Sequence, residues 1–360
     1  MSALTSVYFE PFGTIDGDSQ VQKVTITSNK TKLVLTNFGA TLISFSTPDK
    51  TGVLEDITLC YRSLDEIRAG SVYYGATIGR CANRVANGEF TLNGETYNLE
   101  KNNGPNHLHG GCAGFDKVVW DAKEVENGVK FTYISKDGEA GYPGRLTVSV
   151  TVTLVNGSVL SFEYEASVAG KETPINLCNH TYWNLSGNCK RRILDHTLEI
   201  FSSKFLPVNE TQIPTGELEN TKGTYMDFPV GSKVKIGERI NEVDGGGEPG
   251  YDHCYCVDQS ELNQVASTDN YQMYKVATLC DEISGRRMRI LSSEPGVQLY
   301  TGNFLSKNNE DKPHVQHNAV CLETQHYPNS VNEPKFPSVV LKPGSVFKSK
   351  TVHEFDILAA

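Results

Sequence analysis

Leu146-Thr-Val-Ser-Val-Thr-Val-Thr-Leu154 and Val159-Leu-Ser-Phe-Glu-Tyr-Glu-Ala166 stand on either side of the dipeptide Asn156-Gly157. In both runs apolar side chains alternate with polar ones, which is the pattern of a strand with one buried face. Asn-Gly readily adopts the left-handed backbone conformation that a tight hairpin turn requires. This stretch therefore predicts an antiparallel β-hairpin.

The same alternation recurs along the chain, whereas helical periodicity is scarce. Further strands are predicted at residues 21–27, 31–36, 129–134, 196–200, 288–291, 297–300 and 319–323. Hairpin signals also occur at Asn93-Gly94, Asn127-Gly128 and Asp137-Gly138, and short helices are expected at 63–68 and 234–240. Many short strands with frequent turns favour an all-β antiparallel sandwich or barrel over a parallel βαβ fold.

One glycine-rich tract, Asp244–Gly250, has the composition of a linker. Because strand patterning continues on both sides of it, we expect a loop over a cleft at this position. Residues 1–360 are accordingly expected to form a single domain.

Composition excludes several classes of protein. With 360 residues, 38% of them hydrophobic, the chain can bury a large core without disulfides or a structural metal. A net charge of −10, from 33 basic and 43 acidic side chains, argues against nucleic acid or an anionic membrane as a partner. The first ten residues have neither a basic leader nor an apolar segment, and no run is long enough to span a membrane. The nine cysteines form no CxxC motif, so we expect free, mostly buried thiols and a cytoplasmic protein.

Three segments are unlike ordinary core sequence: residues 105–111, 179–185 and 321–328. They contain His109, His180 and Glu323, and one carboxylate with two imidazoles can move protons between oxygen atoms near neutral pH. Apolar neighbours in its strand would desolvate Glu323 and raise its pKa. The set predicts a proton-transfer enzyme that acts on a hydroxylated substrate.

The sequence leaves alternatives open at two other positions. Arg80 and Arg84 flank Asn83, and either guanidinium could bind a carboxylate or sugar hydroxyls, or form only a surface salt bridge. His107 and His109 form a His-x-His pair, which on a strand would place both rings on one face, as in some zinc sites. No third ligand lies at a recognisable nearby spacing, and the following Gly-Gly favours close approach of a ligand to the backbone.

Aromatic and polar side chains are combined in the segment 179–185, which contains Tyr182 and Trp183. Sugar-binding clefts need both kinds of group, because sugar C–H faces pack on rings while hydroxyls need directional partners. At least one of the two aromatic side chains is expected to lie in the core instead. Asp252 and Gln298 each add a polar group beside glycines.

Taken together and in this order, these segments resemble the aldose 1-epimerase family. The resemblance covers nearly the whole chain and rests on residues 37–42, 79–84, 108–111, 114–118, 141–144, 179–185, 206–210, 213–216, 300–304, 322–325 and 336–337. It implies a large antiparallel β-sandwich, the galactose mutarotase-like supersandwich, with few short helices and an open cleft that binds a hexopyranose.

The resemblance also implies roles for individual residues. The catalytic base falls on Glu323, the catalytic acid on His180 and a second active-site histidine on His109, while sugar-binding positions fall on Asn83, Arg84, Asp252 and Gln298. The implied reaction interconverts the α and β anomers of hexoses such as D-galactose and D-glucose. Glu323 would take the proton of the anomeric hydroxyl, and His180, with an ordinary pKa near neutrality, would protonate the ring oxygen.

This reaction requires neither a cofactor nor a metal, and an aldohexose is the expected partner of a monomer or weak homodimer. Glu323 and His180 are expected to face each other across a pocket the size of one pyranose. Three other functions stay open: a non-catalytic sugar-binding module, a glycosidase with Asp252 and Glu323 as its carboxylate pair, and a phosphosugar epimerase. The sequence does not rank galactose above glucose.

Overall fold

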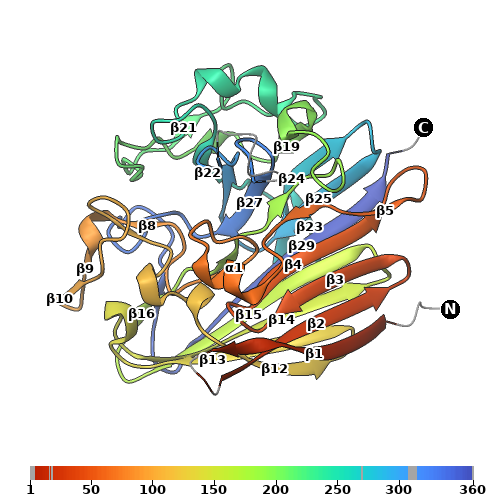
Figure 1. Cartoon of the computed structure of the whole chain (residues 1–360). Coiled ribbons are helices and arrows are strands. Elements are labelled where there is room, and N and C mark those ends of the chain that lie inside the picture. Colours follow the sequence, from red (N-terminus) through yellow and green to blue (C-terminus); the bar gives the residue numbers. More distant parts are fainter. Residues whose placement is uncertain (1–4, 16, 18, 269–270, 307–313, 359–360) are drawn as a thin grey trace.

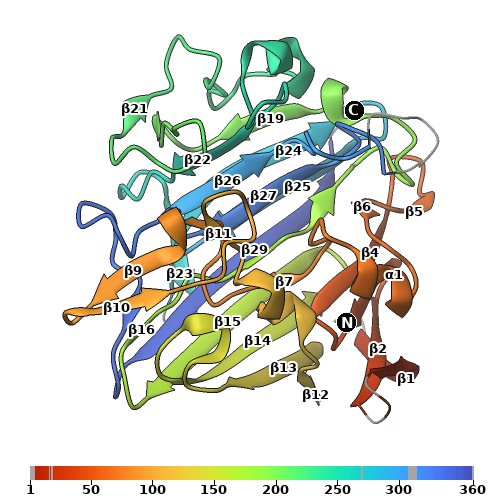
Figure 2. The same cartoon turned by 60° about the vertical axis from the view of Figure 1, so that its left-hand side comes forward.

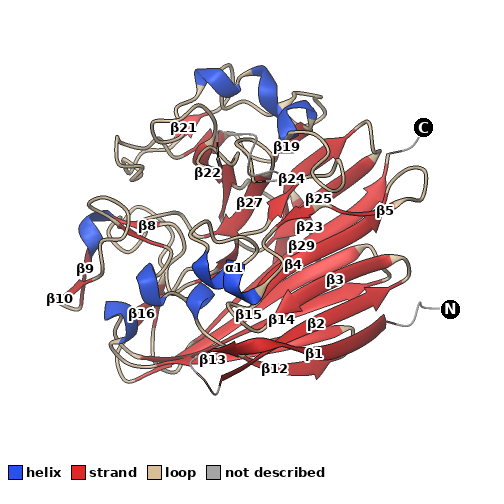
Figure 3. Cartoon of the chain, viewed as in Figure 1, coloured by secondary structure: helices blue, strands red, loops and turns tan. Residues whose placement is uncertain are grey.

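The computed structural model describes residues 5–15, 17, 19–268, 271–306 and 314–358. Strands dominate these residues, and α1 (Leu64–Ala69) is the one α-helix among them (Figure 3). Ser63 caps α1 by accepting a hydrogen bond from the backbone of Glu66, whose side chain bonds back to Ser63. The remaining helical segments are 3₁₀ turns: Ala86–Gly88, Gly111–Ala113, Phe115–Lys117, Glu139–Gly141, Ile193–Asp195, Ile236–Glu238 and Ile240–Glu242.

The largest sheet has nine strands and is antiparallel throughout (Figure 1). Its order is β12 (Asp121–Val125), β13 (Gly128–Ser135), β14 (Arg145–Val155), β15 (Val159–Ala169), β29 (Val346–Ile357), β25 (Arg286–Ser292), β24 (Tyr271–Asp281) and β19 (Thr197–Ile200), with β23 (Gln264–Thr268) paired to β24. Figure 2 shows β13, β14, β15 and β29 lying side by side.

The predicted hairpin lies at the centre of this sheet. Strands β14 and β15 pair from Arg145 opposite Ala169 to Val155 opposite Val159, around the Asn156-Gly157 turn. The inward-facing side chains of β14 are fully buried: Leu146, Val148, Val150, Val152 and Leu154. The alternation therefore buries one face of the hairpin, as predicted.

Two further sheets pack around the same core. A five-stranded sheet contains β1 (Thr5–Ile15), β2 (Ser19–Ser28), β3 (Thr31–Thr36), β4 (Thr41–Pro48) and β5 (Leu54–Asp56). A seven-stranded sheet has the order β21 (Glu219–Asn220), β20 (Lys204–Phe205), β22 (Asp252–Cys256), β26 (Gly296–Tyr300), β27 (Val320–Gln325), β18 (Tyr182–Trp183) and β6 (Thr58–Leu59). One buried hydrophobic cluster joins all three sheets, for example through Leu33, Val150 and Leu322.

Short two-stranded ladders complete the fold. They are β9 (Glu89–Leu92) with β10 (Glu95–Asn98), β8 (Arg84–Val85) with β11 (His107–Leu108), β7 (Thr77–Ile78) with β17 (Cys178–Asn179), and β16 (Thr173–Pro174) with β28 (Val340–Leu341). These small ladders bring Arg84 next to Leu108 and Asn179 next to Thr77, although the pairs are distant in sequence.

The strand predictions are confirmed, and the helix predictions only in part. All nine predicted strands overlap observed ones, and α1 confirms the helix expected at 63–68. The helix expected at 234–240 is wrong, because that segment forms two 3₁₀ turns separated by Arg239, whose backbone is not helical. Asp137-Gly138 begins a longer connection between β13 and β14 that contains a 3₁₀ turn, and not a tight hairpin.

Period-two alternation also separates the two faces of the seven-stranded sheet. Glu323 on β27 pairs with Gln298 on β26, so both side chains lie on the same face. Their strand neighbours Leu299 and Leu322 point to the opposite face, into the core. One face of this sheet is therefore polar although it is buried.

No helix in the described ranges combines the length and apolarity needed to cross a bilayer. All nine cysteines are free thiols, most of them buried, as expected. Residues 1–4, which belong to the N-terminal stretch considered above, lie outside the described residues.

Candidate active site

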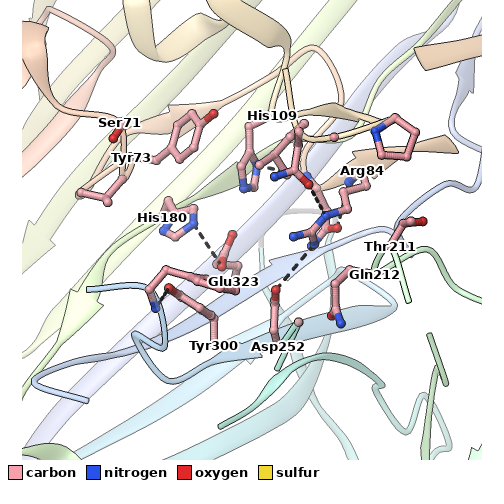
Figure 4. A pocket seen from close by; sticks show the side chains of 18 of the residues that line it. Ser71, Tyr73, Arg84, His109, His180, Thr211, Gln212, Asp252, Tyr300 and Glu323 are labelled. Carbon is pink, nitrogen blue, oxygen red and sulfur yellow. Dashed lines mark hydrogen bonds and ion pairs between the residues drawn. The ribbon is translucent and has the colours of Figure 1, made fainter. Parts of the chain in front are cut away.

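A cavity of about 590 Å³ lies over the polar face of the seven-stranded sheet. Six of the seven predicted site residues line it: Asn83, Arg84, His109, His180, Asp252 and Glu323. They come from five separate segments of the chain, which only the fold brings together (Figure 4).

His180 and Glu323 are in direct contact. The Nε2 atom of His180 lies 3.5 Å from Oε1 of Glu323, and both side chains are almost fully buried. The expectation that a pyranose fits between them is wrong, because this distance leaves no room for a ring. Side by side, a carboxyl group and an imidazole can still exchange protons with two oxygen atoms that are bonded to the same carbon, as the expected reaction requires.

The environment of Glu323 favours its protonated form. Burial raises the pKa of Glu323 to about 8, and the negative charge of Asp252 adds to the rise. A hydrogen bond from the Cys178 thiol to Oε2, at 3.5 Å, acts in the opposite direction. The predicted increase in the pKa of Glu323 is confirmed.

His180 differs from its predicted state. Burial lowers the pKa of His180 to about 4, so the expectation of an ordinary imidazole, half charged near neutrality, is wrong. Its ring stacks on Tyr182 with centroids 5.1 Å apart, and its Nδ1 lies 3.6 Å from the Cys321 thiol sulfur. Burial therefore favours the uncharged form of both groups, a neutral imidazole beside a protonated carboxyl group.

His109 is held in a single orientation by the backbone. Its φ of 53° lies in the left-handed region, so the extended backbone of β11 ends before His109. The His109 side chain therefore does not follow the alternation of faces along the strand. The backbone N–H of Asn83 donates to Nδ1 of His109 at 3.1 Å. Burial lowers the pKa of His109 well below its usual value. The neutral ring therefore carries its proton on Nε2, as a hydrogen-bond donor.

His107 does not share the site with His109. It is fully buried, its Nδ1 lies 2.7 Å from the backbone oxygen of Glu100, and it does not line the cavity. The alternation argument that placed both rings on one face fails here, because β11 ends at Leu108.

A metal ion does not fit the three central side chains as they are arranged. The potential ligand atoms of His109, His180 and Glu323 lie within 4.8 Å of one another. Coordination by a neutral imidazole needs a free lone pair on the nitrogen that faces the metal. On His109 that lone pair is at Nδ1 and already accepts the Asn83 N–H. The chemistry of this donor set favours proton transfer.

Arg84 and Asp252 form a second polar group in the cavity. Nη1 of Arg84 lies 3.6 Å from Oδ2 of Asp252, and Nε of Arg84 donates to Asn103 at 2.9 Å. Asn83, with a left-handed φ of 59°, accepts the Arg84 backbone N–H on its side-chain oxygen at 2.8 Å. These contacts hold the guanidinium and the carboxylate beside the His180–Glu323 pair (Figure 4).

Gln298 is the predicted residue that does not line the cavity. Its Nε2 donates to Oδ1 of Asp252 at 2.6 Å, so in this structure it holds that carboxylate in place. Direct binding of a sugar by Gln298 stays a prediction.

Arg80 lies outside the cavity and is not on the surface. Its guanidinium is buried and donates to the side chain of Ser135, the backbone oxygen of Pro143 and the hydroxyl of Thr173. Both alternatives considered for Arg80, a surface salt bridge and ligand binding, are therefore wrong. Arg80 ties the connection between β13 and β14 to the strand at Thr173.

Sequence reasoning missed several residues of the cavity wall, among them Tyr73, Gln212 and Phe304. The Tyr73 ring packs 4.6 Å from the ring of His109 and 6.0 Å from that of His180. Its φ of 60° is a left-handed conformation that an aromatic residue rarely adopts, and nothing in the local sequence indicates it. Tyr182 lines the cavity and Trp183 lies in the core, as expected for at least one of the two.

Comparisons with known proteins agree with this geometry. The sequence model of the family described as Aldose 1-epimerase matches residues 22–354. Galactose mutarotase from Sus scrofa is 39% identical over 358 residues, covering 98% of this chain and 100% of the relative. Galactose mutarotase from Homo sapiens is 37% identical over the same length and coverage. The crystal structure of galactose 1-epimerase from Lactobacillus acidophilus NCFM superposes with a TM-score of 0.82 at 26% identity, covering 99% of this chain and 100% of that chain. With its antiparallel sandwich and this cavity, the chain belongs to the aldose 1-epimerase family.

Proposed function

We propose that this protein is an aldose 1-epimerase, or mutarotase, that interconverts the α and β anomers of hexoses such as D-galactose and D-glucose. The observation that carries the proposal is the buried contact between His180 and Glu323 in the wall of an open cavity. The names of the relatives support the same activity.

The proposed reaction moves two protons and breaks one bond. Glu323 takes the proton from the anomeric hydroxyl while His180 gives a proton to the ring oxygen, and the C1–O5 bond breaks. The free aldehyde rotates about C1–C2, and the reverse transfers close the ring on either face. Each positioned acid or base contributes on the order of 10²- to 10⁴-fold. Nε2–H of His109 would stabilise negative charge on a sugar oxygen.

The two pKa values explain how the pair starts the reaction. At neutral pH these two pKa values favour a protonated Glu323 beside a neutral His180. The reactive form, a carboxylate beside an imidazolium, has the same number of protons and differs only in which residue of the pair carries the proton. Sugar oxygens that enter the cavity would supply hydrogen bonds to both charges, which favours this form.

The pH dependence of kcat/KM should be bell-shaped, with limbs near pH 4 and pH 8. Below the lower limb both groups are protonated and the base is lost. Above the upper limb both are deprotonated and the acid is lost. NMR anomer exchange on galactose would measure the profile after subtraction of the buffer rate at each pH. A limb near pH 6.5, typical of an ordinary histidine, would contradict this assignment.

Replacing Asp252 with asparagine should shift the alkaline limb to lower pH, because the charge that helps to raise the pKa of Glu323 is removed. The Michaelis constant for galactose should rise roughly tenfold or more, since a charge-assisted hydrogen bond to the sugar would be weakened. The same NMR assay, run over pH and sugar concentration, gives both values. An unchanged alkaline limb would show that Asp252 does not act on Glu323.

The competing functions predict different results in simple assays. A binding module would bind galactose without accelerating anomer exchange, and it has no need for an acid in contact with a base. A glycosidase would release nitrophenol from a nitrophenyl galactoside. A phosphosugar epimerase would need free cations, but among the described lining residues Arg84 is the one Arg or Lys, and Asp252 already neutralises it. Polarimetry on fresh α-D-galactose tests the proposal, and a rate no faster than buffer would overturn it.

Further features of the protein are proposed with the activity. The buried cluster shared by the three large sheets supports one catalytic domain over residues 1–360, and the free thiols support a cytoplasmic location. The net charge of −10 supports the absence of nucleic-acid and membrane partners. We expect a monomer or weak homodimer that needs no cofactor.

A further inference from the structure

We propose that Gln212 determines sugar specificity by accepting a hydrogen bond from the hydroxyl group on C4 of the bound hexose. This inference rests on the proposed mutarotase function. It concerns the choice between galactose and glucose, which the sequence leaves open, because these two sugars differ only in the orientation of that hydroxyl.

The backbone holds Gln212 firmly at the cavity wall. Its φ of 63° is left-handed, in the connection between β20 and β21. The side-chain oxygen of Asn209 accepts the backbone N–H groups of Thr211 and Ile213, at 2.9 and 3.1 Å. Asn106 donates from its side chain to the backbone oxygen of Thr211 at 3.0 Å. These bonds tie the loop to the segment that carries His109.

The amide oxygen of Gln212 lacks a partner. Oε1 is buried and forms no hydrogen bond within the described residues, while the whole residue is 9% exposed and lines the cavity. Buried polar atoms in folded proteins are nearly always hydrogen-bonded, so an unpaired acceptor on a residue of the cavity wall indicates a donor supplied by a ligand, which the amide reaches by turning toward the cavity. A sugar hydroxyl is such a donor.

The glycine-rich loop predicted to cover a cleft packs against Gln212. A Cβ on Gly246, where φ is +94°, would lie 3.3 Å from Cγ of Gln212 and 3.3 Å from Cζ of Phe304. The glycine therefore allows the loop to close over the stem of the side chain. This packing holds the stem of Gln212 at the cavity wall.

The position of Gln212 relative to the catalytic pair selects the C4 hydroxyl. Figure 4 shows Gln212 on the side of the cavity beyond Asp252, and His180 on the other side. Because C1 and the ring oxygen must lie at the His180–Glu323 pair, the opposite side of the cavity receives the far end of the ring. C4 is the ring carbon directly opposite C1.

The inference is tested by comparing wild type and a Gln212 variant on sugars with and without the hydroxyl group on C4. The probes are D-galactose, D-glucose and 4-deoxy-D-xylo-hexose, which is the 4-deoxy form of both. We expect wild-type kcat/KM for the better of the two hexoses to exceed that for the deoxy sugar by roughly tenfold, the value of one hydrogen bond. In Gln212→Leu this ratio should fall to near one, because the acceptor is absent. An equal ratio in wild type and variant would overturn the inference.

Two further variants make the result decisive. Gln325 is another buried glutamine whose amide lacks a partner among the described residues, but it does not line the cavity. Gln325→Leu should therefore leave the ratio unchanged, and a change as large as that in Gln212→Leu would contradict the proposal. If Gln212→Leu does not fold, Gln212→Met, with an unbranched side chain, takes its place in the same comparison. Failure of the proposed function is distinct, because wild type would then accelerate none of the three sugars.

Discussion

Glu323→Gln should lower kcat/KM for galactose mutarotation by about 10²- to 10⁴-fold, the contribution of one positioned base. Glutamine has nearly the same shape as the protonated glutamic acid that burial favours at this position, but it cannot accept the proton of the anomeric hydroxyl. NMR anomer exchange at neutral pH, with the buffer rate subtracted, measures the loss. Activity within tenfold of wild type would rule out Glu323 as the base.

The same variant should be at least as stable as wild type. The pKa of Glu323 is about 8 in the folded protein against an ordinary value of 4.5. The folded state therefore binds more protons than the unfolded state between these pH values, and wild type loses stability as pH rises through this range. Glu323→Gln has no such titrating group. The difference in Tm between the variant and wild type should therefore increase in favour of the variant as the pH is raised from 4.5 to 8.

A matched control is available in Glu294, another buried glutamate, which lies 2.6 Å from Nδ1 of His326 and does not line the cavity. Glu294→Gln should reduce stability, because it breaks this ion pair, and should leave kcat/KM within a few-fold of wild type. An equal loss of activity in both variants would indicate a general effect of changing buried carboxyl groups.

His180→Gln should also lower kcat/KM by about 10²- to 10⁴-fold, because the amide can donate a hydrogen bond but cannot release a proton to the ring oxygen. The double variant with Glu323→Gln should be little slower than either single variant, since acid and base act as a unit. Stopped-time polarimetry on fresh α-D-galactose gives all three rates. Losses that multiply in the double variant would mean that the two groups act independently.

His353 provides the control for this second prediction. Its ring is buried, its pKa is likewise lowered by burial, to about 3, and it lies on β29 away from the cavity. His353→Gln should retain nearly full activity, although its stability should fall because a core packing contact with Trp183 is changed.

The strands could be predicted because their signal is local. The apolar side chains that alternate inward on the two strands, from Leu146 to Leu154 and from Leu160 to Ala166, are buried as the alternation requires. The long strand β29 (Val346–Ile357) was not predicted although it pairs with β15, because its buried side chains are mostly polar: Ser349, Thr351, His353 and Phe355. This segment forms a strand because it pairs with β15 and β25 in the sheet, and its own sequence does not indicate that pairing.

The sequence could predict residues of the cavity wall, but not the contacts among them. His109, His180 and Glu323 stood out by composition, and they do meet in one cavity. The environment of Arg80 could not be predicted, because it depends on a loop far away in the sequence. The separation of His107 from His109 could not be predicted either, because it depends on the left-handed backbone of His109, just after the end of β11.

The sequence by itself determined the all-β architecture and the family, because alternation and motif spacing are properties of neighbouring residues. Only the tertiary structure decided the protonation of the pair and the unpaired amide of Gln212. Desolvation and hydrogen-bond satisfaction are set by atoms that surround a group from every direction. Most of those atoms belong to residues far away along the chain.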